Sequence, residues 1–95
     1  MTRRIVGISL KMYFGHARAT EWFAQVASRV AGCPAVMDGS VEVFVTPTFL
    51  QVPAAIRAFD GTPVRVGGQD VAAEAEGAFT GEVSASELAE VGAGL

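Results

Sequence analysis

The chain has 95 residues, enough for one small domain, and it is apolar for that size: 51% of the residues are hydrophobic and 18% are charged. A net charge of −3, with no stretch rich in Lys or Arg, argues against a nucleic-acid partner. No run approaches the roughly 20 apolar residues that span a bilayer. The single cysteine, Cys33, excludes an internal disulfide, so we expect a cytoplasmic protein without a membrane partner.

The first half of the chain alternates strand-like and helix-like patterns. Residues 4–9 form a nearly continuous apolar run, which predicts a strand covered on both faces and ending just before Lys11. From residue 17 to residue 31, apolar side chains recur every three or four positions, as in an amphipathic helix. Residues 32–40 contain Gly, Pro and Asp and predict a loop. Residues 41–46 are rich in β-forming side chains and predict a second strand.

The second half continues the alternation. Residues 49–59 predict a short helix, in which Pro53 is tolerated because it falls near the first turn. Residues 64–68 predict a third strand. Residues 69–84 form a loop that is too long and too weakly apolar for a plain connection, so we expect it to have a function.

A last short helix is predicted after this loop. Ser84 has the properties of an N-cap, and Glu87 three residues later completes the pattern of a capping box. Leu88 and Val91 are expected to give the helix its buried side, and Gly92 to end it.

The order strand, helix, strand, helix, strand, loop, helix predicts an α/β protein with a parallel sheet. Three such units cannot close a barrel, and an open three-stranded parallel sheet leaves two unpaired edges. Residues 93–95 look like the approach to another strand. The high apolar content fits a chain whose surface is covered by a larger protein. We therefore expect residues 1–95 to be the N-terminal portion of a single longer domain.

Lys11 is the first candidate for chemistry. Ligands bind at the carboxyl ends of strands in α/β proteins, and a lysine delivered there suits an anion such as a phosphate or a developing enolate. Taken alone, this stretch favours the simpler interpretation that Lys11 is the first solvated residue after a strand. The sequence offers no metal-ligand cluster and no nucleotide-binding loop: His16 precedes a helix without an acidic neighbour, and Cys33 has no flanking cation to activate it. We expect neither a metal nor a cofactor.

Two segments resemble the triosephosphate isomerase family, at its spacing. Residues 7–12, Gly-Ile-Ser-Leu-Lys-Met, are similar to its first-strand motif, and residues 77–84, Gly-Ala-Phe-Thr-Gly-Glu-Val-Ser, match its third-loop signature. Residues 68–70 and 46–47 suit the ends of its third and second strands. The resemblance covers the whole chain and implies the first three β/α units of a TIM (β/α)8 barrel, an incomplete barrel of about three eighths of roughly 250 residues.

The resemblance also implies a function. The whole enzyme would interconvert an aldose phosphate and a ketose phosphate, glyceraldehyde 3-phosphate and dihydroxyacetone phosphate, through an enediolate. Lys11 would be the catalytic lysine that faces the phosphate and the enediolate, and Ser9 stands in the place of a substrate-binding asparagine. The implied partner is a second copy of the protein. The implied dimer interface contains Gln69, Phe79, Thr80, Gly81 and Glu82.

Three departures leave the substrate open. Ser9 has a short hydroxyl where the family has an amide, Leu10 replaces the usual tryptophan and Tyr13 the usual asparagine. These changes at the mouth of the site keep a related isomerase of another small sugar phosphate, such as a tetrulose phosphate, as an alternative. A non-catalytic small α/β binding module is the alternative from another class.

The catalytic groups of the family raise a further expectation. Its glutamate base and neutral histidine would follow the third strand, and His16 lies in the first β/α connection instead. The 95-residue chain alone is therefore expected to be inactive.

Overall fold

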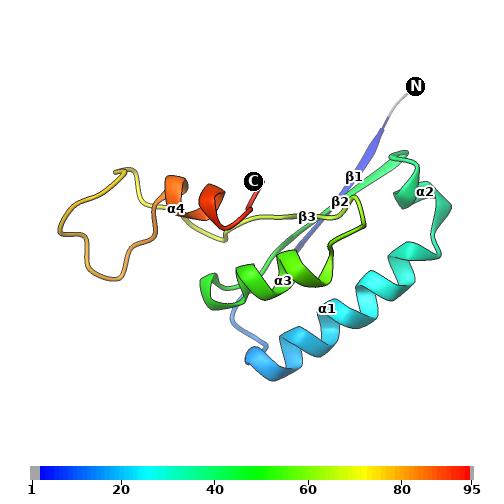
Figure 1. Cartoon of the computed structure of the whole chain (residues 1–95), viewed down its shortest axis with the longest axis horizontal. Coiled ribbons are helices and arrows are strands. Elements are labelled where there is room, and N and C mark those ends of the chain that lie inside the picture. Colours follow the sequence, from blue (N-terminus) through cyan, green and yellow to red (C-terminus); the bar gives the residue numbers. More distant parts are fainter. Residues whose placement is uncertain (1–2, 95) are drawn as a thin grey trace.

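The computed structural model describes residues 3–94 as an open sheet of three parallel strands with helices (Figure 1). The strands lie in the order β1–β2–β3, so each one pairs with its neighbour in the sequence. The α/β prediction is confirmed. In chain order the elements are β1 (Arg4–Ser9), α1 (His16–Ala31), α2 (Pro34–Met37), β2 (Val41–Thr46), the 3-10 helix η1 (Phe49–Gln51), α3 (Val52–Ala58), β3 (Arg65–Val66) and α4 (Ala85–Glu90).

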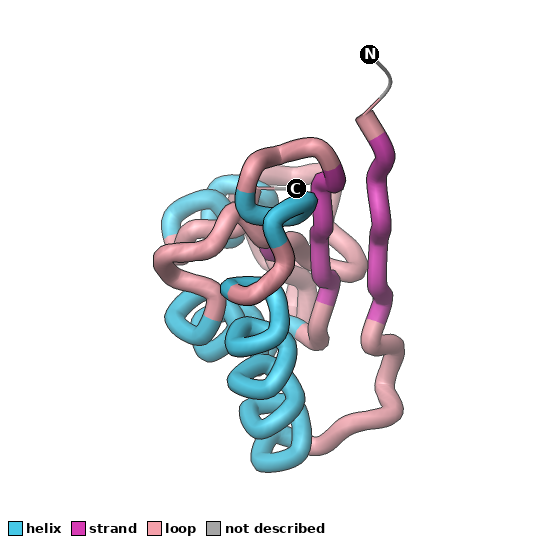
Figure 2. The backbone as a smooth tube through the Cα atoms, turned by 90° about the vertical axis from the view of Figure 1, so that its right-hand side faces the viewer, coloured by secondary structure: helices cyan, strands magenta, loops and turns pink. Residues whose placement is uncertain are grey.

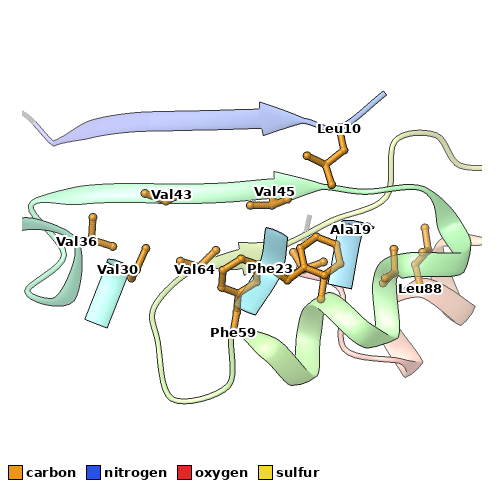
Figure 3. Packing of buried hydrophobic residues seen from close by; sticks show 13 residues of the cluster. Leu10, Ala19, Phe23, Val30, Val36, Val43, Val45, Phe59, Val64 and Leu88 are labelled. Carbon is orange, nitrogen blue, oxygen red and sulfur yellow. The ribbon is translucent and has the colours of Figure 1, made fainter. Parts of the chain in front are cut away.

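The register of the strands separates two faces of the sheet. Residues paired across parallel strands point to the same side, and successive residues alternate. Val43 and Val45 of β2 are buried and point toward the helices (Figure 3). Phe44 therefore belongs to the opposite face, together with its partners Gly7 on β1 and Arg65 on β3. No helix of residues 3–94 is both long enough and apolar enough to cross a membrane.

Helix α1 packs an apolar stripe against the sheet, as the periodicity predicts. Ala19, Phe23 and Val30 are buried, and the helix begins one residue earlier than predicted, at His16. The ring of Phe23 meets the ring of Phe59 edge-on, with 6.0 Å between the ring centres (Figure 3). This contact joins α1 to the end of α3 and anchors both helices on the same side of the sheet.

Strand β1 is exposed, so the prediction that residues 4–9 form a strand covered on both faces is wrong. Ile5 is 62% exposed and Val6 46% exposed. Figure 2 shows the reason: β1 is the outermost strand, with β2 on one side and the helices gathered beyond it. An edge strand without a second neighbour leaves its apolar side chains in water.

Two other expectations need correction. The predicted loop 32–40 contains a single helical turn, α2, in which Pro34 occupies the first turn, where its missing N–H costs no hydrogen bond. The third strand is only Arg65–Val66, shorter than the predicted 64–68. Gly94 donates its N–H to the Val66 carbonyl at 2.9 Å, which adds backbone pairing at this edge. Leu95, the last residue of the predicted approach to a further strand, lies outside the described residues.

Helix α4 begins after Ser84 and ends before Gly92 as predicted, but it has only the Ser84 half of the predicted capping box and buries less than expected. The Ser84 hydroxyl accepts a hydrogen bond from the Glu87 N–H at 3.1 Å, and Gly92 adopts φ +106° beyond the last turn. Leu88 is buried, whereas Val91 is 42% exposed, so the prediction that Val91 is buried is wrong. With six residues, α4 presents only one side chain to the core.

Candidate functional site

The carboxyl ends of the three strands meet at one edge of the sheet because the strands are parallel. Ser9 and Thr46, the last residues of β1 and β2, are register partners. Lys11 follows β1 at this edge, and Gln69 follows β3 three residues after its last residue. The described fold thus brings Ser9 and Lys11 of the predicted substrate site together with Gln69, which the resemblance assigns to the interface.

The backbone of Lys11 is in the left-handed region, with φ +52°. Among the described residues it is the single non-glycine residue with positive φ. This conformation costs such a residue roughly 1–2 kcal/mol, so surrounding contacts must hold it. No local sequence signal indicates it, because glycine, asparagine and aspartate are the residues that ordinarily adopt this region.

Hydrogen bonds hold the peptide groups on both sides of Lys11. Its N–H donates to the Ser9 hydroxyl oxygen at 3.3 Å. Its carbonyl accepts from the side-chain amide of Gln69 at 2.9 Å, and the same amide donates to the Thr46 carbonyl at 3.0 Å. Sequence reasoning missed this contact, since Lys11 and Gln69 are 58 positions apart.

The side chain of Lys11 carries a charge that no carboxylate neutralises within residues 3–94. The salt bridges found there join Glu42 to Arg3 at 3.1 Å and to Arg65 at 3.0 Å. Glu42 lies near the amino end of β2, at the opposite end of the strands from Lys11. The carboxyl edge therefore offers an exposed, unpaired cation, which is what an incoming anion needs.

The three departures from the family motif differ in where their side chains lie. Leu10 is only 6% exposed and points into the core (Figure 3), so the prediction that it shapes the mouth of the site is wrong. Its N–H donates to the Thr46 carbonyl at 3.1 Å, which fixes this orientation. Met12 and Tyr13 are 89% and 81% exposed. Ser9 and Tyr13 remain as departures that a ligand could meet.

The loop that carries the predicted interface residues extends beyond α4, away from β1 (Figure 1). Gly77 and Gly81 have φ values of +140° and +86°, which only glycine adopts readily. Between them Phe79 is 45% exposed, and the Glu82 N–H closes a turn on the Phe79 carbonyl at 3.0 Å. Thr80, Gly81 and Glu82 are exposed as well, so this part of the loop is accessible to a partner.

Other hollows and polar groups lie apart from Lys11. A hollow of about 610 Å³ lies between the segment that follows β3 and α4, and its lining includes Gly68, Gln69 and Leu88 but neither Ser9 nor Lys11. His16 is exposed and is the first residue of α1, whereas the sequence placed it just before the helix. Within residues 3–94 no group of three His, Cys, Asp or Glu side chains is placed to hold a metal ion.

Three parallel strands joined by helices, with a cation at their carboxyl edge, define the chain as an α/β protein. A family model described as "Triosephosphate isomerase" matches residues 4–95. The chain belongs to the triosephosphate isomerase family, and its fold is the N-terminal part of a TIM barrel.

Individual relatives agree with the family assignment. The L-erythrulose-1-phosphate isomerase of Pectobacterium atrosepticum is 38% identical over 87 residues, 92% of this chain and 34% of that protein. The triosephosphate isomerase of Xanthomonas euvesicatoria pv. vesicatoria is 39% identical over 94 residues, 99% of this chain and 35% of that protein. The chain therefore spans about a third of the length of these relatives.

Proposed function

We propose that this chain supplies the anion-binding part of an isomerase that interconverts glyceraldehyde 3-phosphate and dihydroxyacetone phosphate. The observation that supports the proposal is the exposed, unpaired Lys11 at the carboxyl edge, held in a left-handed backbone conformation. Such a substrate would place the enzyme in glycolysis and gluconeogenesis, in the cytoplasm. The family membership and the names of the relatives support the reaction class.

The chemistry follows from the charge of Lys11. Abstraction of a proton next to a carbonyl leaves negative charge on the enediolate oxygens, and the substrate phosphate is already an anion. An ammonium group fixed near the carbonyl stabilises the negative charge that develops on its oxygen in the transition state more than it stabilises the neutral carbonyl of the bound substrate, which accelerates the reaction. The hydroxyl of Ser9 accepts from the Lys11 N–H and keeps its own proton to donate to a substrate oxygen.

The proton transfer itself requires groups that residues 1–95 do not supply. In triosephosphate isomerase, the well-known example of this chemistry, a glutamate base and a neutral histidine act on the substrate. The one histidine of this sequence, His16, heads α1 and is exposed. We therefore propose that the 95-residue chain binds anions weakly and has no turnover alone.

A second candidate substrate is a tetrulose phosphate. The Ser9 side chain is shorter than the asparagine of the family motif and is tied to the Lys11 N–H, so it leaves more space above the end of β1. The relative from Pectobacterium atrosepticum is an L-erythrulose-1-phosphate isomerase by name. A substrate with one more carbon fits the larger space.

The proposed partner is a second copy of the enzyme, joined through residues 77–84. The exposed Phe79 gives this loop an apolar contact, and the positive φ of Gly77 and Gly81 supports its projecting shape. Thr80 at the tip would then enter the partner near that subunit's site, beside its Lys11.

The test is an isomerase assay on a completed barrel. Residues 1–95 are fused to the part of the Pectobacterium atrosepticum protein that follows its matched segment, and turnover is measured with glyceraldehyde 3-phosphate and with L-erythrulose 1-phosphate. We expect turnover that falls by at least about 100-fold in Lys11→Met. Arg29→Met, which removes an exposed cation from the last turn of α1, is the control and should retain activity.

Two results would count against the proposal. A folded fusion with no turnover on either substrate would favour the non-catalytic binding module. Equal activity of Lys11→Met and Arg29→Met would remove Lys11 from the chemistry. The ratio of kcat/KM for the two substrates decides between the triose and the tetrulose, and Ser9→Asn should shift that ratio toward the triose by roughly tenfold.

A further inference from the structure

We propose that Gln51 is a positioning residue for the mouth of the candidate site: its buried side-chain amide fixes the end of the β1–α1 connection and keeps the exposed side chains of that connection clear of Lys11. The inference rests on the proposed function for the importance of the site. It adds a residue that neither the sequence motifs nor the family resemblance assigns to the site, because Gln51 lies on η1, beyond β2.

Gln51 is a buried polar residue whose amide is used at both ends. It is 4% exposed and is the single buried polar or charged residue within residues 3–94. Its side-chain oxygen accepts from the Thr48 N–H at 3.3 Å, and its side-chain nitrogen donates to the Phe14 carbonyl at 2.9 Å. A backbone N–H only donates and a carbonyl only accepts, so one side chain must supply both an acceptor and a donor. Glutamine does so, whereas an ionised glutamate would keep only the acceptor.

The two hydrogen bonds of the amide act on different parts of the fold. The bond with Thr48 is local: it is half of the capping box that begins η1, in which the Thr48 side chain accepts from the Gln51 N–H. The bond with Phe14 joins residues 37 positions apart and links the connection after β2 to the connection after β1. Gln51 therefore acts on the mouth of the site through its donor.

The start of α1 depends on Phe14, because the N-cap of this helix offers no side-chain hydrogen bond. The N-cap residue is Gly15. The ring of Phe14 lies 6.4 Å from the ring of Trp22, centre to centre, and the Arg18 guanidinium carbon lies 4.8 Å from the Phe14 ring centre. The Gln51 amide holds the backbone of the same residue. Ring and backbone contacts together fix the point at which the connection ends and α1 begins.

Two large side chains lie between this anchor and Lys11. Met12 is 89% exposed and Tyr13 is 81% exposed. Side chains of this size gain free energy when they leave water, so a loosely held connection would fold them onto the carboxyl edge and cover the ammonium. The bond from the Tyr13 N–H to the Leu10 carbonyl, at 3.4 Å, is too long to prevent this by itself. Anchoring Phe14 keeps the connection in place and the lysine accessible.

Two residues that occur once in the sequence permit a direct test. Tyr13 is the only tyrosine and Trp22 the only tryptophan, so ¹⁵N-labelling of both types gives one backbone amide signal in the connection and one within α1. We measure the order parameters of both amides in the 95-residue chain, in Gln51→Glu and in the control Thr48→Ala. Gln51→Glu removes the donor to Phe14 and keeps the acceptor of the capping box, whereas Thr48→Ala weakens the capping box and leaves the donor in place.

The expected order parameters are about 0.85 for both amides in the unmodified chain and in Thr48→Ala, with a value below about 0.6 for Tyr13 alone in Gln51→Glu. An amide that only supported the core would cost order at Trp22 as well. A joint loss at Tyr13 and Trp22 therefore overturns the proposal. A rigid Tyr13 in Gln51→Glu, or a flexible one in the unmodified chain, overturns it too.

A second variant covers the case in which a carboxylate at position 51 unfolds the chain. Gln51→Met has a similar length and removes both hydrogen bonds without burying a charge. It should keep the far-UV circular dichroism of the unmodified chain and show the same selective loss of order at Tyr13. If Gln51→Met is unfolded as well, the amide supports the fold as a whole, and the proposal is overturned.

The barrel fusion provides a separate readout of access to the site. A mouth that is covered part of the time lowers the fraction of enzyme that can bind, so Gln51→Met should raise KM several-fold and leave kcat nearly unchanged. An unchanged KM overturns the proposal. A fusion without any turnover contradicts the proposed function instead, and the order parameters, which do not depend on catalysis, then decide the role of Gln51.

Discussion

The ring of Phe44 fills the space that a side chain at Gly7 would need. The two residues are register partners on β1 and β2. A Cβ added to Gly7 would lie 2.2 Å from the Phe44 Cζ atom and 2.8 Å from two other ring carbons. The first residue of the β1 motif is therefore glycine for a packing reason, on the sheet face opposite the helices.

Gly7→Ala should destabilise the chain by about 1–3 kcal/mol, because the methyl group forces the half-buried Phe44 ring to move. The measurement is urea unfolding followed by Trp22 fluorescence. The double variant Gly7→Ala/Phe44→Leu should recover most of the loss, since the smaller side chain leaves room. No recovery would show that the ring is not what excludes a side chain at position 7.

Lys11→Gly should be more stable than Lys11→Ala by about 1 kcal/mol, because only glycine takes φ +52° without strain. Both substitutions remove the ammonium, so the difference between their stabilities gives the free-energy cost of the left-handed backbone at a non-glycine residue. The unfolding midpoints of the two variants give the comparison. Equal midpoints would mean that Lys11 is not left-handed in solution.

Asp38 should contribute a pH-dependent part of the stability. The hydroxyl and the N–H of Ser40 donate to its carboxylate at 2.6 Å and 2.8 Å and hold the pKa of Asp38 below its ordinary value of 3.8. A lowered folded-state pKa stabilises the fold above 3.8, and this contribution disappears as the pH falls through the folded-state value. Asp38→Asn should flatten the stability profile below pH 4, whereas an unchanged profile would show that the Ser40 contacts do not persist in solution.

The exposed edge of β1 should make the isolated chain associate. Ile5 and Val6 present apolar side chains beside an unpaired backbone edge. Ile5→Lys should reduce association in size-exclusion chromatography while leaving the Trp22 emission unchanged. Leu50→Lys, at a residue 88% exposed on η1, is the matched control and should reduce association less. A monomeric unmodified chain would contradict the prediction and favour a self-contained module.

The sequence by itself predicted the order and type of the elements except the single helical turn α2. The spacing of apolar residues distinguished strands from helices, because side chains on one face recur every two residues in a strand and every 3.6 residues in a helix. Local chemistry also predicted the Ser84 cap and the Gly92 stop, since caps depend on neighbours in the chain. The motif around Lys11 and the loop at 77–84 were enough to indicate the family.

The tertiary structure decided which side chains meet. The burial of Leu10 and the exposure of Ile5 depend on what lies across the sheet, and neither pattern is visible in the local sequence. The contact of Gln69 with Lys11 joins segments 58 residues apart, and the left-handed lysine has no signal in its neighbours. Hydrogen bonds between distant strand ends form only once the parallel sheet has brought those ends to one edge. The hydrogen bonds from the Gln69 amide to the Lys11 and Thr46 carbonyls therefore depend on the fold and cannot be predicted from the motif around Lys11.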